Sequence, residues 1–564
     1  MQGGVHMKQF TYYPMHMHLH AACDYGASMA MHMYNAQKLG MRYIWFTDHD
    51  TRTGRKKNAV TGFQFDSLQL LKEEPTGGFH GFKTTDDAMQ YEIDPAKGNV
   101  RLTLQASEDS AWQSSGIFFV SSGTRHTSSL AADVTLSIDV EERNITENGR
   151  LVLDVKLSQR PPECTNGHIL YVLGSTEGLA APHTQIIPLD AQNGKIVLPI
   201  SKDVSEDPEI GGKDNAFDTL TIWLQARSGE KMTVTIRDFQ IHVEKSYEPV
   251  HQGLKIAAAK AGKHYGVTPF VAFEISGAGE HKNCYCTKVP TIDYRQHNYQ
   301  VSEQEAIQHV KAHGGIFAVN HPLASSCLKH KTFTHEEHVQ IIGKMSAELL
   351  ECKANGADLM EVGFPDGRNG FALEEYTGLW DMLSSAGLFL TGYGCSDSHR
   401  DNKNWFDGNN FAAYIGVSAE LPHPIAEEVF VDAMRKGRVY TADPVKVQGA
   451  VEFCTEKGNP MGSVLLSENT QEVPILFSAE QTCPGWQFHL IENGKVAETV
   501  SIQDTHFTYR SILNNNETPV NFQRAELWDE NGRCILITNP IYIVNTDLFA
   551  GDLPAQRLAK EKEA

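Results

Sequence analysis

The feature that most constrains the fold is a repeated pattern: a short apolar run of strand-forming residues that ends in a side chain able to bind a metal ion. Five such runs are "MRYIWFTDHD", "TPFVAFEISG", "GGIFAVNHP", "ADLMEVGFPDG" and "LFLTGYGCSDSH". Patterns typical of helices, most of them stopped by a glycine, lie between them, for example at residues 27–39 and 251–265. This alternation predicts parallel strands whose C-terminal ends meet at one rim of an α/β barrel.

Near the N-terminus, "FTYYPMHMHLHAACDYG" carries His16, His18 and His20 at alternate positions. The aromatic residues before them indicate a strand, and alternate side chains of a strand share one face. An H-x-H pair on one face is consistent with metal ligands or with a polar strand end, so the rest of the chain has to decide.

Most of the other ligand candidates stand at the ends of the apolar runs. The full candidate set is His18, His20, Asp48, His49, Glu274, His321, Asp397 and His399. A mixture of carboxylates and imidazoles suits Zn²⁺, Mn²⁺ or Fe²⁺ better than a soft thiolate site would. Eight candidates exceed the needs of one tetrahedral ion, so we expect two or three divalent transition metals that share bridging ligands.

The domain organisation follows from a long interruption. After the strand at 42–49 the next helical pattern comes only near residue 250, whereas such connections normally take a handful of residues. The intervening segment reads as short alternating strands broken by Gly, Asn and Pro, which predicts an inserted β-sandwich or jelly-roll domain at 57–247. Residues 446–548 read in the same way and predict a C-terminal β-sandwich, followed by a charged tail at 549–564.

Composition excludes several classes of partner. The chain has 564 residues and a formal net charge of −21, so we expect neither nucleic-acid binding nor attachment to an anionic membrane. It has no run of 18 apolar residues and no pattern of a secretory signal at its start, which predicts a cytoplasmic protein. The ten scattered cysteines are then expected to be reduced thiols.

The motifs in their order, H-x-H, T-D-H-D, E-I-S, N-H-P and S-D-S-H, resemble the PHP (polymerase and histidinol phosphatase) superfamily of metal-dependent hydrolases. The resemblance covers roughly residues 10–56 and 248–445 and implies a distorted (β/α)7 barrel, with its first part at 1–56 and its second at 248–445. The long insertion, "GRVYTADP" and the closing "NPIYI" resemble the branch that contains carbaryl-hydrolase-like metallohydrolases.

The resemblance also implies roles for individual residues. His18 and His20 match the first ligand pair, Glu274 the bridging carboxylate, and Asp397 and His399 the last ligands. His49 and His321 match ligands of the second and third ions, and Asp48 lies in the second motif. His16 stands where many members have Asp, and we expect it to support a ligand without touching a metal ion.

The expected function is hydrolysis of a phosphoester, mono- or diester, of a small molecule by a metal-bridging hydroxide. Asp48, His49 or His321 is expected to carry a proton to the leaving group. Arg52 and Arg400 follow ligand motifs and either hold an anionic substrate or form surface ion pairs.

Two alternatives stay open. The same site could cleave a carbamate, a carboxyl ester or an amide, because a fold does not fix a function. Alternatively, the chain is a glycan-binding protein with an inactive barrel. In the enzyme reading, the sandwiches shape the mouth of the active site or mediate contacts between copies of a homo-oligomer.

Overall fold

A computed structural model gives the fold of the protein. It describes residues 10–21, 29–50, 58–63, 65–70, 72–73, 79–109, 111–121, 133–159, 166–190, 194–208, 215–244, 247–276, 280–292, 301–323, 333–368, 370–399, 403–406, 408–419, 421–467, 472–515 and 518–559. The chain divides into two compact units: unit 1 consists of Met1–His20, His32–Thr51 and Ala259–Ala564, and unit 2 of Ala21–Met31 and Arg52–Ala258. Each unit is described by itself.

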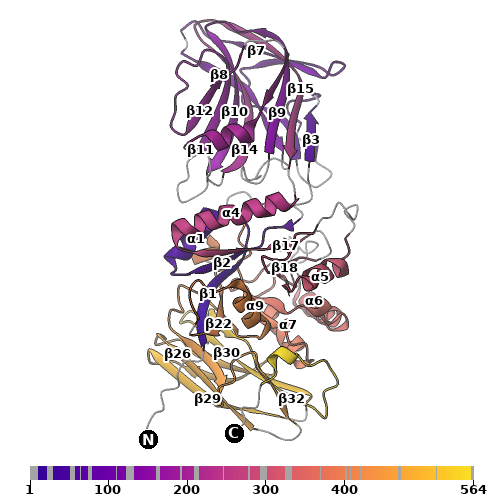
Figure 1. The fold of residues 1–564 in the computed structure, drawn as a ribbon, viewed down its shortest axis with the longest axis vertical. Coiled ribbons are helices and arrows are strands. Elements are labelled where there is room, and N and C mark those ends of the chain that lie inside the picture. Colours follow the sequence, from indigo (N-terminus) through magenta and orange to yellow (C-terminus); the bar gives the residue numbers. More distant parts are fainter. Residues whose placement is uncertain are drawn as a thin grey trace. The chain divides into compact units, whose positions relative to one another are not determined.

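Unit 2 contains two sheets, drawn in indigo to magenta in Figure 1. A seven-stranded sheet has the order β12-β11-β10-β14-β8-β5-β4, and a six-stranded sheet contains β13-β9-β15-β7-β6 with β3 on β15. Apart from the parallel pair β11–β12, neighbouring strands are antiparallel. The elements are β3 (Asn58–Phe63), β4 (Lys72–Glu73), β5 (Phe79–Thr84), β6 (Gln90–Asp94), β7 (Asn99–Gln105), β8 (Gln113–Ser121), β9 (Asp133–Asn144), β10 (Gly149–Gln159), β11 (Asn166–Gly174), β12 (Thr184–Pro188), β13 (Gly194–Leu198), α3 (Ile200–Glu206), β14 (Asn215–Ala226) and β15 (Lys231–Glu244).

The two sheets of unit 2 share one apolar core. Leu151 and Ile222 from the seven-stranded sheet belong to the same buried cluster as Leu136 and Val234 from the six-stranded sheet. The alternation of apolar and polar residues along strands such as β10 places every second side chain in this core.

Unit 1 is built on an 11-stranded mixed sheet whose main path is β16-β2-β1-β22-β23-β31-β30-β27-β28, with β32 pairing with β30 and β25 with β32. β1 is parallel to β2, and β2 to β16, whereas β22 and β23 run antiparallel to their neighbours. The strands are β1 (Phe10–Leu19), β2 (Tyr43–Phe46), β16 (Thr268–Val271), β22 (Ala412–Ser418), β23 (Val439–Ala442), β25 (Val464–Ser467), β27 (Gln487–Glu492), β28 (Lys495–Ser501), β30 (Val520–Trp528), β31 (Cys534–Thr538) and β32 (Ile541–Asn545).

A second sheet of unit 1 has five strands in the order β17-β18-β19-β20-β21, and a third has three in the order β24-β26-β29. Their strands are β17 (Phe273–Ile275), β18 (Lys282–Tyr285), β19 (Ile316–Val319), β20 (Leu359–Gly363), β21 (Thr391–Gly394), β24 (Val451–Thr455), β26 (Glu472–Glu480) and β29 (His506–Asn514). α7 packs against β20 and α9 against β22. Besides α3 of unit 2, the described residues form the α-helices α1 (Met29–Lys38), α4 (Tyr247–Tyr265), α5 (Glu303–Ala312), α6 (His335–Glu351), α7 (Leu373–Ser385), α8 (Lys403–Phe406) and α9 (Glu427–Arg435).

The expected (β/α)7 barrel is wrong: most of the regular structure is strand, and the strands expected to close a barrel are divided between two mixed sheets. The connection between β17 and β18 is too short for the crossover of a dozen or more residues that a parallel pair requires, so these strands are antiparallel. At the other end, β23 pairs with β31 from the C-terminal region. The C-terminal strands β25, β27, β28, β30, β31 and β32 therefore belong to the sheet of β1, whereas β24, β26 and β29 form the three-stranded sheet.

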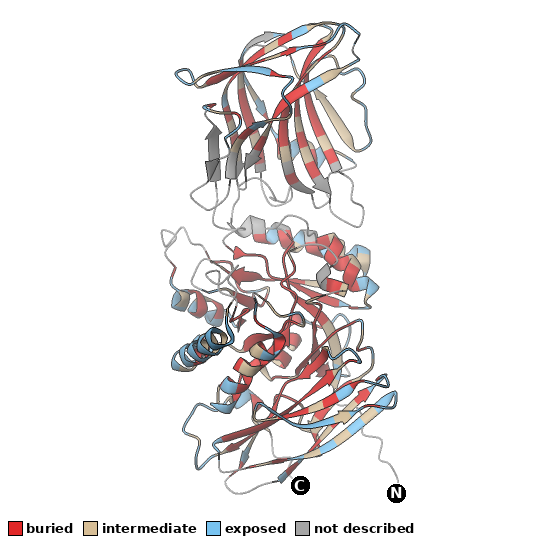
Figure 2. Cartoon of the chain, turned by 180° about the vertical axis from the view of Figure 1, so that it is seen from behind, coloured by how far each residue is buried: buried red, intermediate tan, exposed pale blue. Residues whose placement is uncertain are grey.

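Burial differs between the sheets (Figure 2). β19, β20 and β21 are buried along their whole length, whereas β7 of unit 2 alternates between buried and more exposed residues. Continuous burial is typical of strands covered on both faces. The five-stranded sheet thus places its strand ends, which carry several candidate ligands, deep inside unit 1.

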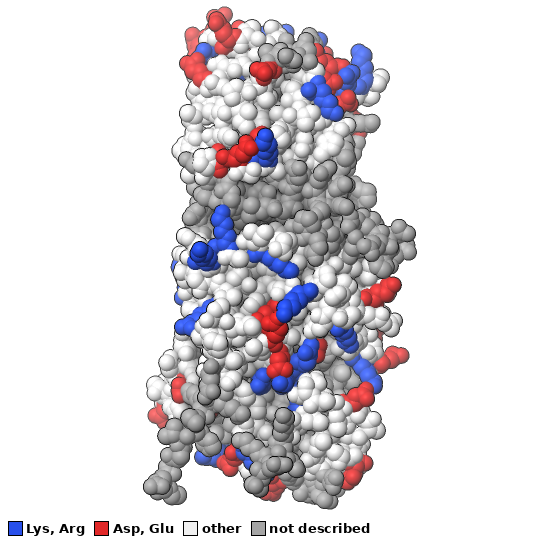
Figure 3. Space-filling view, in the orientation of Figure 1, with Lys and Arg blue, Asp and Glu red and all other residues white. Residues whose placement is uncertain are grey.

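Charged side chains of both signs lie on the surface. Figure 3 shows Lys and Arg interspersed with Asp and Glu over the described residues of the face that it draws. Among the described residues, no helix combines the length and the apolar character that a membrane span needs. The absence of nucleic-acid and membrane partners stays a prediction.

Candidate metal centre

β1 delivers the first two candidate ligands through an irregular strand end. The pairing of β1 with β2 shifts register between His16 and Leu19, and His18 has a positive φ of 59°. Such a bulge turns a side chain away from the simple alternation of a strand and is common beside functional sites. His18 and His20 both point into the cluster, while the ring of His16 lies 4.1 Å from that of Trp405.

Short backbone bridges hold the ligand-bearing segments together. Isolated parallel β-bridges join Leu19 to Ser398 and His49 to Glu274. The amide of Glu274 also donates a hydrogen bond of 3.0 Å to the carbonyl of Asp48. Because these bridges continue the strand pairing beyond the ends of β2 and β21, the side chains at the strand ends converge.

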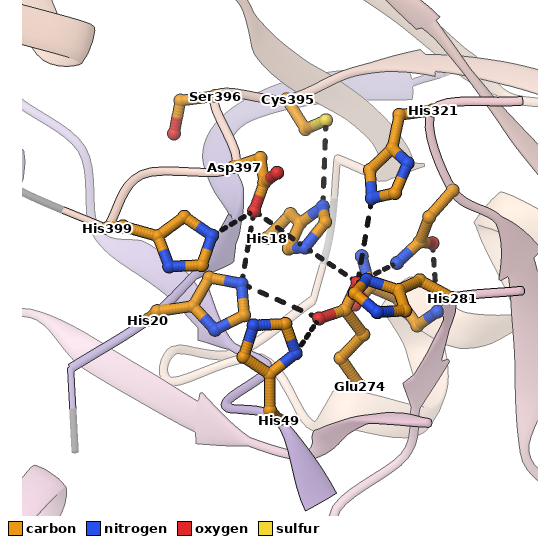
Figure 4. A network of polar contacts seen from close by, with 12 residues as sticks. His18, His20, His49, Glu274, His281, His321, Cys395, Ser396, Asp397 and His399 are labelled. Carbon is orange, nitrogen blue, oxygen red and sulfur yellow. Dashed lines mark hydrogen bonds and ion pairs between the residues drawn. The ribbon is translucent and has the colours of Figure 1, made fainter. Parts of the chain in front are cut away.

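Glu274 is the first centre of this convergence (Figure 4). Its Oε2 lies 2.5 Å from Nδ1 of His49, and its Oε1 lies 3.1 Å from Nδ1 of His281 and 3.8 Å from Nε2 of His321. Asn320 donates a hydrogen bond of 2.7 Å from Nδ2 to Oε1. A carboxylate with both oxygens facing imidazoles can bridge two cations.

Asp397 is the second centre. Its Oδ1 lies 3.1 Å from Nε2 of His18, 3.1 Å from Nε2 of His20 and 2.9 Å from Nε2 of His399. Its Oδ2 is ion-paired with Nη1 of Arg368. The guanidinium therefore occupies one oxygen and leaves the other facing three imidazoles.

The described residues form four groups of three potential ligands, and within each group the ligand atoms all lie within 4.8 Å of one another. The groups are His20–His49–His399, His18–His20–Asp397, His49–Glu274–His281 and His18–Glu361–Cys395. Because His18, His20 and His49 each belong to two groups, the atoms form one connected cluster large enough for more than one ion.

Three candidate ligands have backbone conformations that are unusual for residues other than glycine. His18, His321 and Asp397 have positive φ values of 59°, 24° and 46°. Non-glycine residues seldom adopt positive φ, and residues held in sparsely populated conformations tend to gather at functional sites. The backbone here is shaped to bring side chains together at a cost in local strain.

The carboxylates of the cluster are kept ionised by neighbouring imidazoles and by Arg368. Burial alone would raise the pKa of Glu274, but the imidazoles of His49 and His18 bring it well below its usual value. Burial also acts upward on the pKa of Asp397, and Arg368 and His18 more than reverse this, so that it too lies well below normal. Two ionised, buried carboxylates form a strong site for cations.

The two histidines from the first motif differ in their surroundings. Burial would lower the pKa of His18, but the carboxylates of Asp397 and Glu361 raise it well above its usual value. Burial lowers the pKa of His20 well below normal, and the neighbouring His399 acts in the same direction. His20 is therefore a neutral imidazole with a lone pair available to a metal ion.

The donor set fits divalent metal ions. Nε2 of His18 and Oε2 of Glu274 are buried and make no hydrogen bond to any part of the chain that the structure describes, although charged groups lie close to both. Buried polar atoms are normally hydrogen-bonded, so atoms that face one another without such bonds suggest a shared ligand. Imidazole and carboxylate donors suit Zn²⁺, Mn²⁺ or Fe²⁺.

The structure places the sequence-predicted residues as follows. It brings together the side chains of His18, His20, His49, Glu274, His321, Asp397 and His399. Asp48 is buried beside them and joins the site through its backbone carbonyl. Arg52 and Arg400 lie outside the described residues. Nδ1 of His16 lies 3.5 Å from Oγ of Ser396, which is not one of the candidate ligands. The expected role of His16 in support of a ligand therefore stays a prediction.

Among the residues that take part in the cluster but were not in the candidate set are His281, Asn320, Glu361, Arg368 and Cys395. Glu361 stands in one of the apolar runs, and Asn320 directly precedes a candidate ligand, so both carried a usable signal. His281 precedes β18, and Arg368 lies in the turn "DGRNG". Nothing in their local pattern separates these two from ordinary loop residues.

Comparison with known proteins leaves the family open. No protein-family profile and no curated protein matches the sequence. Among solved structures, an endoglucanase Cel12A from Rhodothermus marinus is 12% identical, with 33% of this chain and 100% of that chain covered and a TM-score of 0.23.

Two further solved structures are similar to the chain at equally low TM-scores. The family 30 carbohydrate-binding module of a cellulosomal cellulase of Clostridium thermocellum is 14% identical, with 32% of this chain and 96% of that chain covered and a TM-score of 0.18. The xyloglucanase domain of NopAA from Sinorhizobium fredii is 5% identical, with 31% and 100% covered and a TM-score of 0.21. At TM-scores this low, the likeness supports no conclusion about this chain.

Proposed function

We propose that this protein is a metal-dependent hydrolase that uses two or three divalent transition metals to cleave a phosphoester of a small molecule. The observation that carries the proposal is the convergence of imidazoles and carboxylates on Glu274 and Asp397, both buried and both held ionised. Hydrolases that activate water at a multinuclear centre need such a set of donors.

The geometry supports the following sets of ligands. His18, His20 and Asp397 would hold one ion, with Glu274 beside them. His281 and His321 lie on the other side of Glu274, and His49 and His399 lie together with His20 in a further group. When bound, divalent ions supply Lewis acidity and lower the pKa of a coordinated water.

The partly exposed side chains mark the side that a substrate reaches. The side chains of His281, His399 and Arg368 are 37%, 33% and 22% exposed, whereas His18 and Glu274 are fully buried. Arg368 places a permanent positive charge at this rim, where a guanidinium can also hold an anionic oxygen of a substrate. This charge supports a phosphoester over a neutral ester.

The protein's own residues also supply a route for the proton. Nδ1 of His49 lies 2.5 Å from Oε2 of Glu274, and Nε2 of His321 lies 3.8 Å from Oε1, so both imidazoles stand beside the central carboxylate. An imidazole in this position can give a proton to a leaving group. His321 is the better placed of the two, because Nδ1 of His49 is already 2.6 Å from Oγ of Ser276.

Membership of the PHP superfamily is part of the same proposal. It is supported by the order of the five sequence motifs and by the convergence of their side chains in one cluster. The expected barrel does not support it, because the strands form two mixed sheets. A cytoplasmic location is also proposed, since all the described cysteines are free thiols, among them Cys352 and Cys483 on the surface.

The test is a substrate panel with the metal-loaded protein and its chelator-treated counterpart. We expect hydrolysis of nitrophenyl phosphate mono- or diesters that disappears with chelator and returns with Mn²⁺, Zn²⁺ or Fe²⁺. Activity against naphthyl esters and carbamates alone, with the same metal dependence, would replace the phosphoester by the second bond type. No metal-dependent activity on either panel would contradict the proposal.

A further inference from the structure

Glu361 lies behind the candidate metal centre and is fully buried on β20. Its Oε1 is 2.5 Å from Nδ1 of His18, and its Oε2 accepts a hydrogen bond of 2.7 Å from the backbone amide of His321. One carboxylate thus contacts two candidate ligands that come from distant segments and whose Nε2 atoms lie 3.4 and 3.8 Å from Oε1 of Glu274.

The contact with His18 fixes which ring nitrogen faces the cluster. An ionised carboxylate can only accept hydrogen bonds, so Nδ1 of His18 must be the donor. Nε2 is then the nitrogen left for a cation, and it is this atom that lies 3.1 Å from Oδ1 of Asp397. A carboxylate on the far nitrogen of an imidazole holds the ring in one tautomer and one orientation.

Glu361 is itself held in place by two further buried side chains. Tyr393 donates a hydrogen bond of 3.0 Å from its hydroxyl to Oε1, and Asn283 donates one of 3.2 Å from Nδ2. The hydroxyl of Tyr285 lies 2.9 Å from that of Tyr393. These contacts satisfy the carboxylate and leave it little freedom to rotate.

We propose that Glu361 is a positioning residue that fixes the orientation of His18 and the backbone of His321, so that both present their Nε2 atoms to the metal ions. This inference rests on the proposed function. Because His321 has a positive φ of 24°, its backbone needs such a fixed acceptor to keep that conformation. Glu361 acts through these ligands and not on a substrate.

The variant Glu361→Gln tests the proposal in the full chain. An amide offers one acceptor and one donor in place of two acceptors, so it can serve either His18 or His321 but not both. We expect affinity for Co²⁺, measured by competition with a chelator, to fall about 10- to 100-fold. The visible absorption of the Co²⁺-loaded protein should change as well, because the geometry of coordination changes.

Glu427→Gln is the matched control. Glu427 is a buried carboxylate that accepts hydrogen bonds of 2.8 and 3.0 Å from the amide of Thr287, and it is not part of any of the four ligand groups. We expect its Co²⁺ affinity and spectrum to match those of the wild type. A change of equal size in both variants would mean that loss of stability, and not positioning, explains the effect, and would overturn the inference.

The remaining outcomes separate the two proposals. If the wild type binds no Co²⁺, the proposed function fails. If the wild type binds Co²⁺ and Glu361→Gln binds it equally well with the same spectrum, the positioning role is wrong and the metal centre stands. If Glu361→Gln does not fold, Tyr393→Phe removes a single donor to Oε1; an affinity loss of about 3- to 10-fold then supports the inference, and an unchanged affinity and spectrum overturns it.

Discussion

Nε2 of His20 lies 3.1 Å from Oδ1 of Asp397, although 377 positions separate the two residues in the chain. His20 follows β1, and Asp397 follows β21 of a different sheet. Such a contact between a neutral imidazole and an ionised carboxylate is formed by the tertiary fold alone. It makes the candidate centre sensitive to single substitutions at its bridging groups.

Glu274→Gln should remove the bridge of the cluster. Because Glu274 faces five imidazoles with its two oxygens, we expect the variant to lose at least one metal equivalent. Activity should fall by more than the roughly 100-fold that is lost when a residue that only hydrogen-bonds a metal ligand is replaced. Metal content and hydrolysis are measured together.

Glu280→Gln is the control for this variant, because Glu280 is an exposed carboxylate only six positions away. Its metal content and activity should equal those of the wild type. A Glu274→Gln protein that keeps its full metal content and activity would show that the carboxylate does not bridge.

Arg368→Met should separate the two candidate bond types. The change removes the positive charge at the rim, so kcat/KM for phosphoesters should fall at least about 10-fold, the loss expected when a charge-assisted hydrogen bond disappears. Neutral esters should be affected much less. The comparison is made at matched metal content, because Arg368 also holds Asp397; equal losses on both substrate classes would count against an anion-binding role.

Asp381→Ala should destabilise unit 1. Arg524 makes two hydrogen bonds to Asp381, of 2.8 and 2.7 Å, in a buried contact between α7 and β30. Removing Asp381 breaks this buried ion pair and leaves Arg524 with Glu526 as its remaining ionic partner, so the free energy of unfolding should fall by up to about 3–5 kcal/mol. Urea unfolding measures this loss.

Two further variants control that prediction. The triple variant Asp381→Leu/Arg524→Met/Glu526→Gln should recover most of the loss, since it removes all three charges of the buried network. Asp432→Ala breaks a more exposed ion pair with Lys436 and should change the free energy of unfolding by less than about 1 kcal/mol. A loss in Asp381→Ala no larger than this would mean that the buried pair does not join the C-terminal strands to α7.

His251 should make unit 2 less stable in acid. Burial, with a smaller effect from Lys255, lowers the pKa of His251 from 6.5 to about 3. The unfolded chain binds the proton more readily than the folded chain does. The contribution of His251 to the free energy of unfolding is therefore fully present above pH 6.5, and below that pH it is lost by at most about 1.4 kcal/mol per pH unit. Circular dichroism during heating at pH 6.5, 5.5 and 4.5 follows the loss.

His251→Gln should flatten this dependence, and His264→Gln, at an exposed position of the same helix α4, should not. If the thermal midpoints of His251→Gln and the wild type decline in parallel between pH 6.5 and 4.5, His251 is not the group responsible.

Much of the site could be predicted from the sequence because each ligand follows an apolar run. His18, Glu274 and Asp397 are recognisable from what precedes them, and a strand end is where the backbone can present a side chain. His281 and Arg368 could not be predicted in this way. They come from connections whose course depends on the packing of distant elements, and no short-range pattern encodes that course.

The fold was less predictable than the site. Helices such as α5, which starts at a capping box formed by Ser302 and Glu305, have local signals. The pairing of strands has none, because an apolar run such as β22 fits a parallel or an antiparallel neighbour equally well. The barrel was therefore expected from alternation alone, whereas β22 runs antiparallel to β1 and β23 accepts the C-terminal strand β31.

The central claim is that the cluster around Glu274 and Asp397 binds metal ions. Elemental analysis tests it most directly, on protein grown with added Mn²⁺, Zn²⁺ and Fe²⁺ and purified without chelator. We expect two or three equivalents of transition metal per chain, lost together on dialysis against a strong chelator. Less than one equivalent per chain under these conditions would contradict a multinuclear centre.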